Sequence, residues 1–186
     1  WSKLDEKLEP LVPNETIFRL LNHSKIKLKN KNVLDIGMSD GANLLECKKR
    51  GANIFGTDIR GKTVYSFYKK NNLNKNNFFV NDLNYSFPKL KKKMNLVICK
   101  DTICYIDKSK QLNFLKNCSS ILKKDGRILI QYIQAQIKQP KRKSLKYRNA
   151  FSGVHLKKYH HESNPINYIG DAHIKNIVNL SNLRIE

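Results

Sequence analysis

The sequence predicts an α/β fold, a three-layer sandwich in which helices cover both faces of a mostly parallel β-sheet. Short apolar runs, each long enough for one strand, recur along the chain at 33–36, 53–59, 78–80, 94–99 and 127–130. Helical patterns separate most of these runs, which is the alternation expected of βαβ units. The run at 94–99 is almost wholly apolar, which is typical of a central parallel strand buried on both faces.

Five segments have the apolar spacing of helices: 15–21, 42–50, 61–72, 109–122 and 171–180. Asn14 is the expected N-cap of the first helix, and Asp171 is the expected N-cap of the last. Gly51 is expected to end the second helix as its C-terminal cap. Residues 183–185 are apolar enough to begin a sixth strand.

The 186 residues fit one domain, which we place at 1–186. Within it we expect an N-terminal helical lead at 1–32 and an insertion at 138–170, where basic residues alternate with Tyr, Phe and His. Such a mixture can hold a phosphate, a carboxylate or a nucleic-acid backbone, although a solvated loop has the same composition. The first residue is Trp1, so we expect the chain to begin inside the gene product.

The formal net charge of +21 favours a polyanionic partner such as nucleic acid. The net charge has a second explanation. AT-rich coding would favour Lys, Asn and Ile throughout the chain, and much of the charge would then lie on a solvated surface. The charge alone therefore does not decide between these readings. No apolar run is long enough to span a membrane, and no secretory signal opens the sequence.

The four cysteines lack the Cys-x-x-Cys spacing of redox and zinc sites: Cys47, Cys99, Cys104 and Cys118. We interpret them as small buried apolar residues in a reducing, cytoplasmic compartment. The histidines at 155, 160 and 161 stand far from them in sequence, so we expect no metal site.

The most informative stretch is 33–44, where an apolar strand leads through Asp35 and Gly37 into a helical pattern. Gly37 can adopt a positive φ or let a ligand approach the backbone, and the following helix opens with free N–H groups. Such turns lie at the carboxyl ends of parallel strands, where open α/β sheets bind nucleotides. By itself this turn is compatible with an S-adenosylmethionine (SAM) site, a NAD site or a structural turn.

The pattern Asp35-x-Gly37-x-Ser39-x-Gly41 resembles the first motif of class I SAM-dependent methyltransferases, with Ser39 in place of the middle glycine. The stretch 122–130, a glycine turn followed by a β-branched strand, resembles the passage into the fifth strand of that family.

The resemblance covers about 33–130 well and 171–185 weakly. It implies a Rossmann-like methyltransferase sheet that lacks its last strand here.

The resemblance also implies SAM as methyl donor and S-adenosylhomocysteine as product. Asp35 would orient the amino-acid end of the cofactor, Asp58 would hold the ribose hydroxyls, and Asp82 with the N–H of Leu83 would hold adenine. The expected cofactor-binding set is Asp35, Gly37, Ser39, Gly41, Asp58, Ile59, Asp82, Leu83 and Lys100. A helix N-cap is the alternative role for Asp58.

The implied reaction is an in-line displacement at an activated sulfonium methyl, so the protein mainly supplies alignment and desolvation. Asp101 and Tyr105 would flank the reacting methyl; alternatively, Asp101 caps the next turn and Tyr105 packs. A general base is needed only where the acceptor must lose a proton. The candidates are Asp101, Tyr105 and His160, together with Tyr132, His155 and His161.

We therefore expect an enzyme that methylates an oxygen or nitrogen of a small anionic metabolite or a glycan precursor. An RNA or DNA methyltransferase is the first alternative. The charge supports it, but the sequence lacks the Asn-Pro-Pro-aromatic and Pro-Cys motifs of DNA methyltransferases. The second alternative is a non-catalytic subunit with the same fold that binds a partner.

Overall fold

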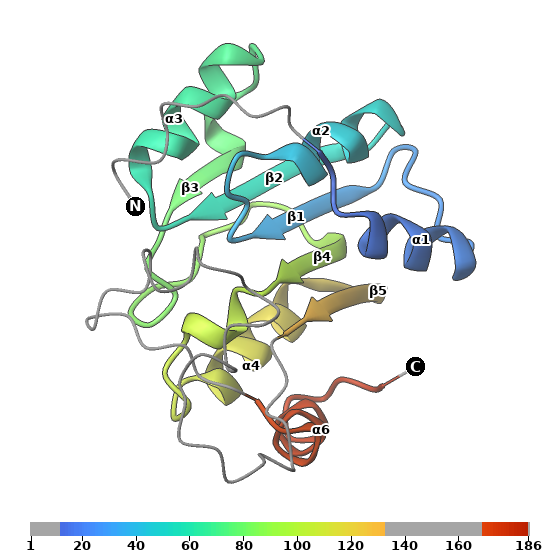
Figure 1. Ribbon diagram of the computed structural model, residues 1–186, viewed down its shortest axis with the longest axis vertical. Helices are drawn as coiled ribbons and strands as arrows, with labels where there is room; N and C mark the ends of the chain where they lie inside the picture. The colour runs from blue at the N-terminus through green and yellow to red at the C-terminus, as the bar shows by residue number, and fades with distance from the viewer. Residues whose placement is uncertain (1–11, 133–168, 186) are drawn as a thin grey trace, which may run out of the picture.

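A five-stranded, wholly parallel sheet forms the centre of the computed structural model, which describes residues 12–132 and 169–185 (Figure 1). Its strands are β1 (Asn32–Ile36), β2 (Asn53–Asp58), β3 (Phe78–Val80), β4 (Met94–Lys100) and β5 (Leu122–Gln131). They lie in the order β3-β2-β1-β4-β5, and every neighbouring pair is parallel. The predicted fold class is confirmed.

The strand order reverses between β1 and β4, because the chain runs outward from β1 to β3 and then returns to the other side of β1. Ile36 of β1 lies beside Thr57 of β2 and Cys99 of β4, so the carboxyl ends of these three strands meet at one edge. Open α/β sheets bind ligands at such a switch point.

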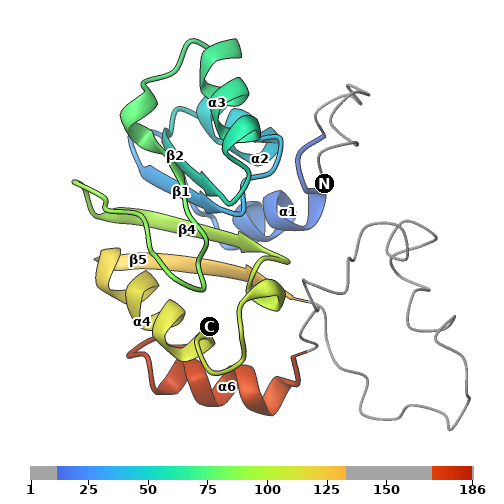
Figure 2. The same cartoon turned by 90° about the vertical axis from the view of Figure 1, so that its left-hand side faces the viewer.

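Within the described residues, five α-helices cover the sheet: α1 (Glu15–His23), α2 (Ala42–Lys49), α3 (Gly61–Lys70), α4 (Gln111–Ile121) and α6 (Asp171–Asn179). Alternate residues of β1 point to opposite faces. Val33 therefore belongs to an apolar core with α1, α2 and α3, whereas Leu34 belongs to a core with α4 and α6. Figure 2 shows α4 and α6 side by side beneath β5.

The N-terminal helix is anchored close to the turn after β1. Asn14 caps α1 as predicted, because its side chain accepts a hydrogen bond from the backbone N–H of Ile17 at 3.0 Å. The backbone N–H of Asn14 also donates to Oδ1 of Asn43 in α2, at 2.8 Å. The lead helix is thereby tied to the first turn of α2.

Two predictions near the C-terminus are wrong. Residues 183–185 form no strand, and the backbone N–H of Leu183 instead donates to the carbonyl of Val178, closing the end of α6. Gly170, not Asp171, occupies the N-cap position of α6. The carboxylate of Asp171 accepts a hydrogen bond from the hydroxyl of Tyr132 at 2.7 Å, which links α6 to the end of β5.

The four cysteines are buried free thiols, as predicted. Burial raises the pKa of Cys47 to about 12, so this thiol stays protonated and unreactive. Within 12–132 and 169–185, no group of His, Cys, Asp and Glu is arranged to hold a metal ion. None of the helices in that part of the chain combines the length and the apolar character that crossing a bilayer requires.

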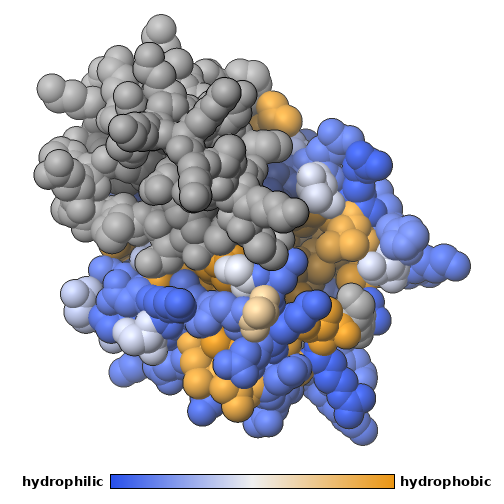
Figure 3. Space-filling view, turned by 60° about the horizontal axis from the view of Figure 1, so that its bottom comes forward, coloured by the Kyte–Doolittle hydropathy of each residue, from blue (hydrophilic) through white to orange (hydrophobic). Residues whose placement is uncertain are grey.

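Hydrophilic side chains cover much of the described surface in the view of Figure 3, with smaller apolar groups between them. Hydropathy alone does not mark out a functional site on this face. A functional site has to be found from local geometry rather than from the total charge.

Candidate functional site

The turn after β1 is held in an unusual backbone conformation. Gly37, Ser39 and Gly41 all have positive φ, at 72°, 49° and 80°. The N–H groups of Gly37 and Met38 both donate to the carbonyl of Thr57, at 2.8 and 3.0 Å. Ser39 pays a conformational cost of about 1 kcal/mol for this left-handed geometry, which glycine adopts freely.

Gly37 is required by a close contact as well as by its φ. A Cβ atom at this position would overlap the side chain of Thr102. The Thr102 hydroxyl lies within hydrogen-bonding distance of the carbonyls of Ile36 and Lys100, at 2.9 and 3.1 Å. Thr102 therefore joins the ends of β1 and β4 and leaves space only for a hydrogen atom at residue 37.

Asp58, at the end of β2, faces this turn. Its Oδ2 accepts a hydrogen bond from the backbone N–H of Ser39 at 2.9 Å. Its Oδ1 accepts from the backbone N–H of Arg60 at 2.9 Å and from the Arg60 Nε at 3.3 Å. Arg60 holds the N-cap position of α3, so Asp58 does not have the alternative role of a helix N-cap.

The Arg60 guanidinium extends across the same region, because its Nη2 donates to the hydroxyl of Ser39 at 3.0 Å. An ionised carboxylate accepts about four hydrogen bonds, and the three contacts of Asp58 leave room for one more. The two hydroxyls of a ribose would need two acceptor positions on Asp58. One hydroxyl would therefore have to replace the Arg60 Nε on Oδ1. Arg60 was not among the residues that the sequence pattern singled out.

Asp35 lies beneath the turn and is only 1 % exposed. Its Oδ2 has no hydrogen-bond partner among the described residues. Burial raises its pKa to about 7, and the nearby Asp58 adds to this effect, while a hydrogen bond with Asn43 and the charge of Lys100 oppose it. Ionisable groups whose pKa is shifted this far are concentrated at functional sites.

The ends of β2 and β3 present an exposed apolar surface beside polar groups. Ile59 and Val80 are 59 % and 56 % exposed, which is high for large apolar side chains. Asp82 follows β3, and its Oδ1 accepts a hydrogen bond from the backbone N–H of Asn84 at 2.9 Å. Leu83 is partly buried against the core. Val80 is a further candidate, missed because it looked like an ordinary strand residue.

The segment after β4 carries the other predicted residues. Lys100 Nζ lies 2.8 Å from Asp101 Oδ2. Asp101 has a φ of 55° and does not cap the short helix η2 (Ile103–Tyr105), whose N-cap position belongs to Thr102. Tyr105 is half-buried, and this burial raises the pKa of its hydroxyl. The phenol of Tyr105 therefore holds its proton more firmly than an exposed tyrosine does.

Two further groups of base candidates remain. His160, like His155 and His161, lies outside the described residues, as does nearly all of the expected insertion at 138–170. Burial and the neighbouring Asp171 raise the pKa of Tyr132 to about 12. With its hydroxyl donated to Asp171, Tyr132 serves to hold α6.

Comparisons with known proteins agree with this geometry. The model of a family described as "Methyltransferase domain" matches residues 6–186. No curated protein matches the chain significantly.

Three solved structures illustrate the likeness. Magnesium protoporphyrin IX methyltransferase from Synechocystis PCC 6803 with bound SAM has 19% identity and a TM-score of 0.62, covering 92% of this chain and 68% of that one. A putative methyltransferase from Bacillus halodurans C-125 has 13% identity and a TM-score of 0.68, with coverages of 92% and 70%. A SAM-dependent methyltransferase from Archaeoglobus fulgidus has 21% identity and a TM-score of 0.61, with coverages of 91% and 69%.

The family match spans nearly the whole chain, and the three solved structures share its fold. This chain belongs to the methyltransferase-domain family, and it is a class I SAM-dependent methyltransferase.

Proposed function

We propose that this chain transfers the methyl group of SAM to an oxygen or nitrogen of a small anionic acceptor. The observation that carries the proposal is the position of Asp58, which faces the Gly37–Gly41 turn from the end of β2. The buried Oδ2 of Asp35 beneath that turn has no hydrogen-bond partner among the described residues, which fits a ligand that brings a positive charge. Similar structures with bound SAM and S-adenosylhomocysteine support this choice of cofactor.

Each part of the cofactor has a group that would hold it. Asp58 would accept the ribose hydroxyls, and the turn that begins at Gly37 would place its backbone beside the cofactor. Asp82 and the N–H of Leu83 would hold the adenine edge, with Ile59 beside the ring. Asp35 would interact with the charged amino-acid end. When bound, SAM supplies an activated methyl group on a sulfonium.

The acceptor would bind beside the segment that follows β4. Lys100 is partly exposed there and offers a positive charge to an anionic group of the acceptor. Asp101, held next to it, would take the proton from an acceptor that must lose one. A neighbour of the same fold is named for a small-molecule acceptor, magnesium protoporphyrin IX, which supports an acceptor of low molecular weight. The four buried thiols support a reducing, cytoplasmic compartment.

A nucleic-acid acceptor is the second candidate, and the net charge of +21 favours it. The two candidates can be separated by following labelled methyl transfer from SAM into a pool of phosphorylated and carboxylated metabolites and, in parallel, into RNA. We expect label in the metabolite pool. Label found in RNA alone would contradict a small acceptor.

Replacing Asp101 with asparagine should lower kcat by about 10²–10⁴-fold where the acceptor loses a proton, because the amide cannot take that proton. The affinity for S-adenosylhomocysteine should stay unchanged. Asp107→Asn is the matched control, because Asp107 is an exposed carboxylate in an ion pair with Lys110 in the same part of the chain. Equal rates for the two variants would remove Asp101 from the mechanism.

Binding of S-adenosylhomocysteine should tighten between pH 6 and pH 8, by up to about tenfold per unit below pH 7. The pKa of Asp35 is raised to about 7, so the free protein holds this carboxyl largely protonated below that pH. The cationic ammonium of the ligand favours the ionised form, so binding releases a proton. Calorimetry in two buffers of different ionisation enthalpy measures that release.

The pH dependence of folding stability has the opposite sign to the pH dependence of ligand binding. Because the folded-state pKa of Asp35 is higher than the unfolded value, its favourable contribution to stability is complete below about pH 4 and is lost as pH rises through 7. Asp35→Asn removes this titration and should also abolish the proton release. Undiminished release from Asp35→Asn would assign the proton to another group.

A further inference from the structure

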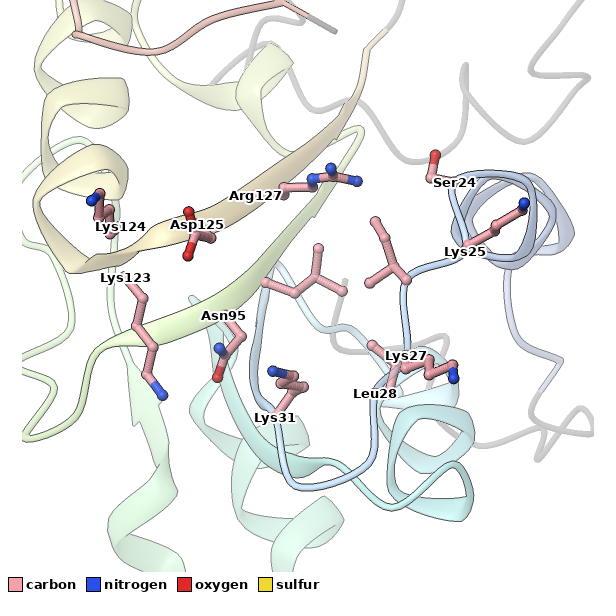
Figure 4. A pocket seen from close by; sticks show the side chains of 12 residues that line it. Ser24, Lys25, Lys27, Leu28, Lys31, Asn95, Lys123, Lys124, Asp125 and Arg127 are labelled. Atoms are coloured by element: carbon pink, nitrogen blue, oxygen red, sulfur yellow. The ribbon is translucent and has the colours of Figure 1, made fainter.

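A cleft opens at the edge of the sheet opposite to the cofactor site. It lies between the loop that joins α1 to β1 and the first residues of β5, and its volume is about 640 Å³ (Figure 4). The amino-terminal parts of β4 and β5 contribute Asn95, Leu96 and the residues around Asp125. No residue proposed for methyl transfer takes part in this cleft.

Cationic side chains line both sides of the cleft. Lys25, Lys27 and Lys31 come from the loop after α1, and Lys123, Lys124 and Arg127 come from β5 (Figure 4). All six are exposed. Asp125 is the only carboxylate among the residues that line the cleft, so the lining carries a net charge of +5 from six cations and one anion.

This concentration exceeds the basic composition of the chain. Lys and Arg supply six of the twelve lining residues, against 36 of 186 residues in the sequence. Within the described ranges, none of the five lysines of the cleft forms an ion pair with a carboxylate, whereas Lys100 and Lys110 do. The lysines therefore repel one another across the cleft, and an anionic ligand would relieve that repulsion.

The cleft is too far from the cofactor site to hold part of a small acceptor. The seven residues of β4 separate the two edges, which corresponds to roughly 20 Å at the rise of an extended strand. A ligand of the cleft is therefore either a separate molecule or a polymer that reaches around the domain.

We propose that this cleft binds the phosphate backbone of a duplex nucleic acid. Lysine ammonium groups are point charges that contact phosphates without reading sequence. None of the lining residues is aromatic, so the cleft offers no platform for the unstacked bases of a single strand. Cations on two facing sides suit a rod of phosphates better than the flat surface of a membrane. The inference is independent of the acceptor proposed above.

Binding of a labelled RNA duplex of about 20 base pairs, followed by fluorescence anisotropy at about 0.05–0.2 M salt, tests the proposal. The triple variant Lys27→Gln, Lys31→Gln, Lys123→Gln should weaken binding at least about tenfold. It should also reduce the slope of log K against log salt by about 2–3, because three phosphate contacts are lost. The corresponding Lys→Arg triple should bind the duplex as the wild type does.

The matched control also removes three exposed lysines, but from helices away from the cleft: Lys70→Gln, Lys116→Gln, Lys175→Gln. A change of less than about threefold in this control supports a localised site. Equal losses of duplex affinity in the two triple variants would show that binding depends on the overall charge and not on the cleft, which would overturn the proposal. Inorganic tripolyphosphate displacing the duplex at equal concentration, or phosphatidylserine vesicles binding where the duplex does not, would overturn it as well.

Discussion

Replacing Asp58 with asparagine should weaken binding of S-adenosylhomocysteine about 100-fold or more. The two ribose hydroxyls would donate to a charged carboxylate, and hydrogen bonds to charged groups contribute about 1.5–3 kcal/mol each. An asparagine amide keeps one acceptor oxygen and carries no charge, so most of this energy is lost. Isothermal titration calorimetry with S-adenosylhomocysteine measures the loss directly.

The Asp58 side chain also accepts a hydrogen bond from the backbone N–H of Ser39, so the substitution changes a contact of the turn as well. The thermal midpoint without ligand therefore has to be measured beside the affinity. Asp125→Asn is the control, because Asp125 is an exposed carboxylate at the opposite edge of the sheet. If Asp58→Asn binds the ligand as tightly as Asp125→Asn does, the ribose is held elsewhere.

Replacing Gly37 with alanine should destabilise the protein by about 2–4 kcal/mol and lower Tm by about 10 °C. Two causes act together. The φ of 72° is unfavourable for any residue with a Cβ, and that Cβ would collide with Thr102. Because Thr102 fixes the ends of β1 and β4, relief of the collision should also displace the turn and abolish cofactor binding. Thermal unfolding with and without S-adenosylhomocysteine measures both effects.

Gly170→Ala is the matched control for this variant. Gly170 has a φ of −83°, and no atom of the described residues lies within 4 Å of the position that its Cβ would take. The change in stability at this site should stay within about 0.5 kcal/mol. Adding Thr102→Ala to Gly37→Ala should restore part of the lost stability, because it removes the collision and leaves only the cost of the φ. Equal stability of Gly37→Ala and Gly170→Ala would refute the steric account.

The strands of the sheet and the residues that follow them could be predicted because each depends on a short stretch of sequence. A buried parallel strand is a continuous apolar run, and the residue after it must lie at the carboxyl edge. Asp58 and Asp101 were placed at that edge in this way, and Asn14 was identified as a cap from its position before a helical pattern. The roles of the predicted residues toward a ligand stay predictions.

The remaining features depend on contacts between distant segments. Nothing in the sequence around Arg60 shows that its guanidinium reaches Ser39, and nothing around Thr102 shows that it excludes a side chain at Gly37. The prediction of a strand at 183–185 was wrong because the apolar residues there suit the end of a helix as well as a strand. The cleft lysines come from segments about a hundred residues apart, so only the folded chain brings Lys27 and Lys123 together.

The most direct test of the cofactor site is a crystal structure of the complex with S-adenosylhomocysteine. We expect the ribose hydroxyls to lie on Asp58, the Arg60 Nε to have left Oδ1, and the adenine to cover Ile59. A ligand bound at another edge of the sheet, or an Asp58 that keeps all three of its present contacts, would show that Asp58 does not hold the ribose.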